Sequence, residues 1–339
     1  MVNSSPWVGC IPHIMNIFFY HKQNPSTNIN QDAFDYNKLY VDNMFANITF
    51  TSKRFPQSRL FLIEDGLNTS NLNLPNLTIL KRYKNLSPRH RDFLKNYFHF
   101  YEGTPVQLIL SFFERWFYIY NILTSHGIEN FVGLDSDCIL LEDTSSHNYK
   151  KIGINHPPSI EDCWPNSLMC STANLNKFLD FVCSFYEGAQ QHITKAKQKQ
   201  KSTPSPRRPM QEGAGIKYIN SFFDKPRTGV CDMALWYLFK KQNPDLFINN
   251  LTIGHDSGVH DWGLGHDATP FATMPAQKRN PQGTLQTIDI KQIFYTEDGP
   301  CFEEKDTKKL IKIKSLHFSP GTLKFDIIPF IEEYEKIYN

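Results

Sequence analysis

The chain has 339 residues, of which 40% are hydrophobic and 14% aromatic, so it can bury a substantial core and is not disordered overall. The 36 Lys and Arg against 34 Asp and Glu give a net charge of +2, so overall charge suggests no nucleic-acid partner. No apolar run approaches the roughly 18 residues of a transmembrane helix. We recognise no signal peptide, and the seven scattered cysteines lack a C-x-x-C pair. We therefore expect a cytoplasmic protein with reduced thiols.

The first half of the chain alternates short apolar runs with segments of helical spacing. The apolar runs predict buried strands at residues 13–20, 59–63, 77–80 and 129–134. The helical segments lie at residues 32–45, 88–100 and 107–124. This alternation predicts an α/β fold with a mostly parallel, twisted sheet flanked by helices. Ligands of such sheets bind beyond the carboxyl ends of the strands, so we expect the functional residues there.

The second half is less regular. Helices are expected at residues 174–187, 230–241 and 326–338, and strands at residues 246–253 and 312–318. Residues 190–211 combine six Lys and Arg with three Pro and hold no acidic or aromatic residue. We expect a mobile basic loop here, which could contact an anionic membrane surface or simply extend into solvent. Without aromatic residues the loop does not fit single-stranded nucleic acid.

The strongest functional pattern is Asp135-Ser136-Asp137, which stands between the apolar strand predicted at residues 129–134 and the apolar residues 138–141. Two neighbouring buried carboxylates repel each other unless a proton or a cation intervenes. Carboxylate oxygens are preferred ligands of Mg²⁺ and Mn²⁺, and such an ion can stabilise a departing diphosphate. We therefore interpret the segment as a metal site, with an acidic turn as the simpler alternative.

The pattern of apolar strand, D-S-D and apolar strand resembles the metal motif of GT-A glycosyltransferases, which use nucleotide-diphosphate sugars. Three further segments resemble that superfamily. Residues 114–117 (ERWF) are similar to a helix that precedes the motif strand, and residues 231–233 (CDM) to a helix start near the acceptor. Residues 316–324 (LHFSPGTLK) resemble the H-F-x-G-x-x-K ending of the glycogenin and bacterial lipopolysaccharide galactosyltransferase type, with one extra residue between Phe and Gly.

The resemblance implies a GT-A, Rossmann-like fold with a smaller acceptor-side subregion. Residues 1–143 would bind the nucleotide sugar, and residues 144–339 would supply the acceptor site and a C-terminal segment for metal and diphosphate. The implied cofactor is Mn²⁺ or Mg²⁺, the donor a nucleotide-diphosphate sugar, foremost a UDP-sugar, and the acceptor a saccharide or lipid-linked saccharide, as in polysaccharide biosynthesis. The ending at His317 favours retention at the anomeric carbon. Such an enzyme could lie at the inner membrane face through residues 190–211.

The resemblance assigns Asp135, Asp137 and His317 to the metal, and Asp135 and Ser136 also to the donor. A histidine that ends an apolar strand can complete a ligand set with two carboxylates, although a hydrogen-bonded core histidine is the alternative. Lys324 would contact the diphosphate, or else be a solvated surface lysine.

Two further residues are candidates for catalysis. Arg115 lies in a strongly apolar helix, so it must pair with Glu114 or a motif aspartate, or contact the donor. Asp232 begins a predicted helix, where a carboxylate can cap the free N–H groups. It could instead contact the acceptor hydroxyl or act as general base.

Three residues at the ends of predicted strands are candidates for the nucleotide. Asp65 could bind the base or ribose, or belong to a polar turn. Tyr20 and His21 could stack on the base or donate hydrogen bonds to it.

Residues 254–267 (GHDSGVHDWGLGHD) hold three His-Asp pairs in a glycine-rich segment. They could bind a metal, line the acceptor site with Trp262 as a sugar platform, or form a polar loop.

Other functions could use the same acids. A metal-dependent phosphohydrolase acting on sugar nucleotides would hold its metals with the His-Asp residues. A nucleotidyltransferase would need a glycine-rich basic loop after the first strand, and residues 21–25 (HKQNP) do not provide one. A saccharide-binding protein with a structural ion would not consume a nucleotide sugar.

Overall fold

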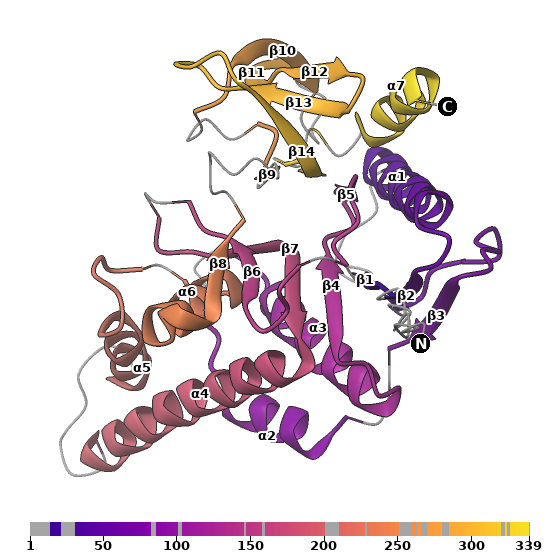
Figure 1. The fold of residues 1–339 in the computed structure, drawn as a ribbon. Helices are drawn as coiled ribbons and strands as arrows, with labels where there is room; N and C mark the ends of the chain where they lie inside the picture. The colour runs from indigo at the N-terminus through magenta and orange to yellow at the C-terminus, as the bar shows by residue number, and fades with distance from the viewer. Residues whose placement is uncertain are drawn as a thin grey trace, which may run out of the picture.

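The computed structural model describes residues 14–21, 31–82, 86–100, 104–145, 147–157, 160–200, 210–227, 229–250, 259–261, 263–265, 270–279, 285–319, 323 and 326–338. Within them the chain forms a seven-stranded sheet, a five-stranded sheet and a two-stranded hairpin (Figure 1).

The large sheet confirms the predicted α/β fold. Its strand order is β3-β2-β1-β4-β7-β6-β8, and the strands from β3 to β4 are all parallel. Only β7 runs antiparallel to its neighbours, β4 and β6, among the described strands of this sheet. The strands are β1 (Asn16–Tyr20), β2 (Arg59–Glu64), β3 (Leu77–Lys81), β4 (Asn130–Leu134), β6 (Ile152–Asn155), β7 (Trp164–Ser171) and β8 (Phe247–Asn249).

Helices cover both faces of this sheet (Figure 1). Along β1, Phe18 packs into a cluster with the helix residues Trp116 and Trp236, whereas Ile17 and Phe19 pack on the other face with residues of α1. A strand buried on both faces needs apolar side chains at successive positions, which explains the continuous apolar run. The helices are α1 (Gln31–Arg54), α2 (Pro88–Asn96), α3 (Val106–Ser125), α4 (Thr172–Gln200), α5 (Met210–Asn220), α6 (Asp232–Gln242) and α7 (Ile327–Tyr338), with a 3₁₀ turn, η1, at Pro244–Leu246.

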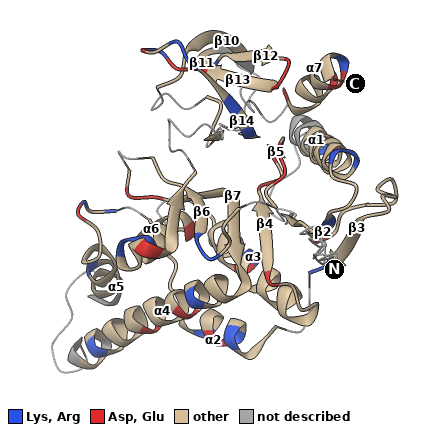
Figure 2. Ribbon diagram, viewed as in Figure 1, with Lys and Arg blue, Asp and Glu red and all other residues tan. Residues whose placement is uncertain are grey.

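The five-stranded sheet meets the large one at the D-S-D turn. After β4 ends at Leu134, a short turn leads into β5, which pairs antiparallel with β14 so that Cys138 lies opposite His317. Figure 2 shows acidic residues next to β5 and basic residues on β14, and Glu142, just after β5, pairs with Lys312 of β14. The strands are β5 (Cys138–Leu140), β9 (Val259–His260), β12 (Ile293–Thr296), β13 (Gly299–Glu303) and β14 (Leu310–His317), and the hairpin is β10 (Thr273–Arg279) with β11 (Leu285–Lys291).

The boundaries of the elements differ from the predictions where tertiary contacts decide them. α1 continues to Arg54, well past the expected end at residue 45, because Ile48 and Phe50 still find buried partners. α2 ends at Asn96, before the expected residue 100. The strands β6 and β7 were not expected, since the middle of β7 carries the polar residues Asn166 and Ser167. Both side chains are buried, so β7 is a buried strand that lacks the continuous apolar run by which buried strands were predicted.

The expectation of a loop over residues 190–211 is wrong for much of that segment. α4 continues to Gln200, and α5 begins at Met210. Glutamine, lysine and alanine are good helix formers, and Ile193 anchors this end of α4 at 5% exposure. Basic composition therefore marked a solvated helix face here rather than a loop. Residues 201–209 lie outside the described residues.

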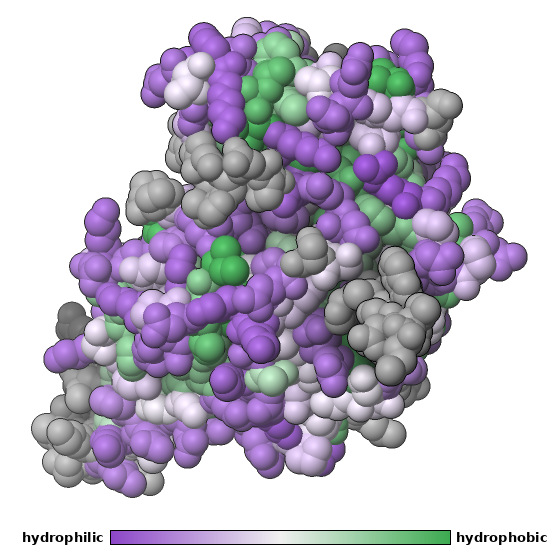
Figure 3. Space-filling view, viewed as in Figure 1, coloured by the Kyte–Doolittle hydropathy of each residue, from purple (hydrophilic) through white to green (hydrophobic). Residues whose placement is uncertain are grey.

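Among the residues that the structure describes, no helix is long and apolar enough to cross a membrane. On the face shown in Figure 3, hydrophilic residues divide the hydrophobic surface into small areas. The six cysteines in the described part of the chain form no disulfide.

Candidate active site

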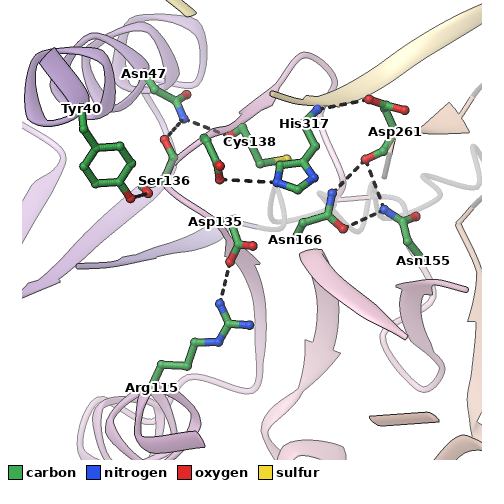
Figure 4. A network of polar contacts seen from close by, with 11 residues as sticks. Tyr40, Asn47, Arg115, Asp135, Ser136, Cys138, Asn155, Asn166, Asp261 and His317 are labelled. Carbon is green, nitrogen blue, oxygen red and sulfur yellow. Dashed lines mark hydrogen bonds and ion pairs between the residues drawn. The ribbon is translucent and has the colours of Figure 1, made fainter. Parts of the chain in front are cut away.

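The D-S-D turn is held by hydrogen bonds from several elements (Figure 4). The N–H of Cys138 donates to the Asp135 carbonyl at 2.9 Å and closes the turn. From α1, the side-chain amide of Asn47 donates to the carbonyls of Ser136 at 3.1 Å and Cys138 at 2.9 Å. The hydroxyl of Tyr40, also on α1, hydrogen-bonds the Ser136 hydroxyl. The long helix α1 therefore holds the residues on both sides of Asp137.

The structure brings the three predicted metal ligands together. One ligand atom from each of Asp135, Asp137 and His317 lies within 4.8 Å of the others. Asp137 and His317 are buried, at 4% and 6% exposure, and the His317 Nε2 lies 3.5 Å from an Asp137 oxygen. The side chain of Asp135 is 30% exposed, so it faces the solvent side of the group. Two carboxylates and an imidazole suit Mn²⁺ or Mg²⁺ and leave coordination positions for phosphate oxygens.

Arg115 joins this group to Asp232. Its guanidinium lies 2.6 Å from Asp135 and 2.7 Å from Asp232, and it stacks over the Trp116 ring at 4.5 Å. Of the pairings considered from the sequence, the structure thus shows the one with a motif aspartate. Glu114 pairs instead with Arg82, at 2.8 Å.

Asp232 is the first residue of α6, with Cys231 in the capping position. The Asp232 carboxylate is 2% exposed and accepts hydrogen bonds from Arg115 and, at 2.9 Å, from the Trp116 indole. Burial raises the pKa of Asp232, and the Arg115 charge and the two hydrogen bonds oppose that rise. Asp232 therefore reaches the metal group through Arg115, and its roles as acceptor contact or general base stay predictions.

The three candidates for nucleotide binding lie at the carboxyl ends of β1 and β2. Tyr20 is half-buried and stacks on Tyr118 at 6.4 Å, and burial raises the pKa of its hydroxyl. His21 is 8% exposed, its ring lies 5.9 Å from that of Tyr40, and burial lowers its pKa. Asp65 is exposed and pairs with Arg82 at 3.3 Å. Because Tyr40 also contacts Ser136, His21 and the D-S-D turn share one neighbour.

Asp261, from the His-Asp segment, and three residues with no predicted role lie beside this group. Asn155 and Asn166 donate their side-chain amides to the carbonyl of Asp261, at 3.2 and 2.9 Å, and the Asn166 carbonyl accepts the N–H of Asp135 at 3.0 Å. Asp261 pairs with the buried Lys291. Asp261 belonged to the noticed His-Asp segment, but no local pattern distinguished the other three from ordinary polar residues.

Several predicted residues lie outside the described part of the chain. They are Lys324 and, in the His-Asp segment, His255, Asp256, Trp262, His266 and Asp267. His260 and Asp261, the described pair of that segment, interact with other residues and not with each other. His260 hydrogen-bonds the Ser315 hydroxyl at 3.0 Å, and Asp261 pairs with Lys291.

Buried His260 gives a testable pH dependence. Burial, and secondarily the charge of Lys314, lowers the pKa of His260 from 6.5 to about 3. Because the folded pKa lies below the unfolded one, this stability is present above pH 6.5 and is lost as the pH falls towards 3. Each pH unit in that window is worth up to about 1.4 kcal/mol. Between pH 7 and pH 5 we expect the free energy of unfolding to fall by about 2 kcal/mol more in the unaltered protein than in His260→Gln.

Urea unfolding at the two pH values measures this difference. His192→Gln, on the exposed side of α4, is the control and should follow the unaltered protein. Equal pH dependence of the unaltered protein and His260→Gln would show that His260 takes up its proton without unfolding.

No family model and no curated protein matches this chain. Solved structures resemble it at low identity. An active-site mutant of LgtC has 11% identity and a TM-score of 0.30. The match includes 51% of this chain and 65% of LgtC, so this chain covers less than two thirds of that protein. The apo form of mouse xyloside xylosyltransferase 1 has 9% identity and a TM-score of 0.41, over 69% of this chain and 84% of its own. A transferase with two Cys-to-Ser substitutions has 12% identity and a TM-score of 0.28, over 73% of this chain and 98% of its own. Similarity at this level assigns no role to any residue here.

Proposed function

We propose that this protein is a metal-dependent glycosyltransferase, which moves a sugar from a nucleotide-diphosphate sugar to a hydroxyl of a saccharide or glycoconjugate. The observation that carries the proposal is the group of Asp135, Asp137 and His317 at the carboxyl end of β4. This is the edge at which ligands of parallel sheets bind. Three ligands with open positions fit an ion that also contacts a diphosphate.

Each residue of the group has a part in this reaction. Asp137 and His317, both buried, would hold Mn²⁺ or Mg²⁺, and the more exposed Asp135 would reach the ion or the ribose. The bound ion would neutralise the charge that develops on the departing diphosphate. Arg115 keeps the Asp135 carboxylate in place and adds a positive charge beside the group. Lys324, predicted from the sequence, would add a second one.

The donor would lie along the ends of β1 and β2. Tyr20 and His21 would offer aromatic rings for the base, and Asp65 a carboxylate for base or ribose. The Ser136 hydroxyl, which hydrogen-bonds Tyr40, would contact the donor at the D-S-D turn. On this basis we assign residues 1–143 to the nucleotide-sugar part, and residues 144–339 to the acceptor part and the C-terminal segment for metal and diphosphate. The proposed donor is a UDP-sugar, and the proposed acceptor is a saccharide or a lipid-linked saccharide. We further propose retention at the anomeric carbon and a cytoplasmic location.

The test is donor turnover. The protein is incubated with a panel of nucleotide sugars and acceptor saccharides, with Mn²⁺ or with EDTA, and the release of nucleoside diphosphate is measured. We expect release from one donor, and EDTA should lower the rate by about a hundredfold or more, because the ion stabilises the leaving group. Readdition of Mn²⁺ to the EDTA-treated protein is the control.

The same assay separates the rival functions. Release of free phosphate or of nucleoside monophosphate would favour a phosphohydrolase. If no product forms, calorimetry decides: metal-dependent binding of a nucleotide sugar supports the proposal, and the absence of any nucleotide binding refutes it.

A further inference from the structure

Behind His317 lies an ion pair that is almost fully buried. Lys291 ends β11, and its side chain has no exposure. The Lys291 ammonium lies 2.5 Å from one Asp261 oxygen and 2.5 Å from the Gly263 carbonyl. Asp261 is 1% exposed. Removing two charges from water costs free energy, and only good geometry and hydrogen bonds to both partners offset it. A small displacement of Asp261 or Lys291 would therefore destabilise the pair.

Asp261 connects both segments that carry the metal ligands. Its second carboxylate oxygen accepts the backbone N–H of His317, at 3.4 Å (Figure 4). Its carbonyl accepts the side-chain amide of Asn166, and the Asn166 carbonyl accepts the N–H of Asp135. Asp261 is thus hydrogen-bonded directly to the end of β14 and, through Asn166, to the D-S-D turn.

Lys291 ties these contacts to a separate part of the chain. The β10–β11 hairpin belongs to neither of the larger sheets. The backbone N–H of Lys291 donates to the Leu264 carbonyl, and the Leu264 N–H donates to the His317 carbonyl at 2.9 Å. The hairpin therefore meets the end of β14 through both the backbone and the side chain of Lys291.

We propose that Asp261 and Lys291 are positioning residues for the metal centre, which hold the end of β14 so that the His317 imidazole faces Asp137. The inference rests on the proposed function, because it takes the three ligands to bind a metal. The carboxylate is needed because its two oxygens serve different partners, Lys291 and the His317 N–H. An amide has one acceptor oxygen, and its NH₂ would oppose one of these two donors.

The first experiment measures Mn²⁺ affinity directly, from the signal of free Mn²⁺ in electron paramagnetic resonance, on the full chain without donor. Asp261→Asn should bind Mn²⁺ about tenfold or more weakly, the usual loss when a group that orients a metal ligand is changed. The control is Leu179→Ala, in the core around α4, which should lower Tm but leave Mn²⁺ affinity unchanged. A folded Asp261→Asn protein that binds Mn²⁺ within twofold of the unaltered protein overturns the proposal.

Lys291→Gln serves if Asp261→Asn does not fold, because glutamine keeps an N–H donor but loses the charge. The same loss of affinity is expected, and unchanged affinity again refutes the positioning role. If the unaltered protein binds no Mn²⁺ at all, the metal part of the proposed function fails. The positioning role is then decided by NMR of labelled histidines in metal-free protein, with the His317 signal assigned by His317→Gln. A ring shift in Asp261→Asn that Leu179→Ala lacks supports the role, and identical spectra refute it.

Discussion

Metal-dependent release of nucleoside diphosphate is expected to fall about a thousandfold when Asp137 is replaced by asparagine. The ion should contribute several kcal/mol of charge stabilisation in the transition state, and 1.36 kcal/mol corresponds to a factor of ten in rate. An amide oxygen carries no net charge and is a weaker ligand for a hard ion than a carboxylate. Asparagine has nearly the same volume, so the turn with its bonds from Asn47 should remain folded.

The measurement is the initial rate across a Mn²⁺ titration, together with thermal unfolding. Asp143→Asn is the matched control: it makes the same substitution a few residues further on, at an exposed aspartate that caps a local turn. Its rate and Mn²⁺ response should equal those of the unaltered protein. An Asp137→Asn protein with a normal Mn²⁺ response would place the functional ion away from this group.

Replacing Arg115 by methionine is expected to destabilise the fold by about 3–5 kcal/mol. The change leaves the Asp232 carboxylate, 2% exposed, without its counter-ion. Arg227→Met is the control, because Arg227 holds Asp162 at a similar distance, 2.8 Å, but that carboxylate is 22% exposed. Water can screen the Asp162 charge, so the loss of its ion pair with Arg227 should lower the free energy of unfolding by only about 1 kcal/mol.

A double substitution separates the two contributions of Arg115. Arg115→Met with Asp232→Asn removes both charges, so most of the lost stability should return in urea unfolding. Activity should not return with it, because Asp135 still lacks the partner that orients its carboxylate. If the double variant stays as unstable as Arg115→Met alone, the cost lies in lost packing against Trp116 rather than in an unpaired charge.

The pairing partners of Arg115 illustrate the limit of sequence reasoning at this site. Its apolar surroundings in α3 showed that the charge must be satisfied, and that expectation depends only on local composition. Which acid satisfies it depends on where β4 and the start of α6 lie against α3. The sequence neighbour Glu114 points to Arg82 and His90 instead.

The same limit applies to the basic segment and the His-Asp segment. Charge composition at residues 190–200 said nothing about helicity, because solvated helices and loops share lysine and glutamine. In the His-Asp segment the residue type suggested metal binding, but Asp261 meets a lysine from a hairpin whose strands were not expected.

The sequence by itself determined the order of strands and helices up to residue 134 and placed two carboxylates at the end of a buried strand. These features are local, since apolar periodicity and turn residues act over a few neighbours. Only the tertiary structure decided that β5 leaves the large sheet to pair with β14, which sets His317 opposite Cys138 and beside Asp137. Such contacts join distant segments, and they depend on sheet register and on buried hydrogen bonds such as those of Asn47, Asn166 and Asp261, which no local pattern records.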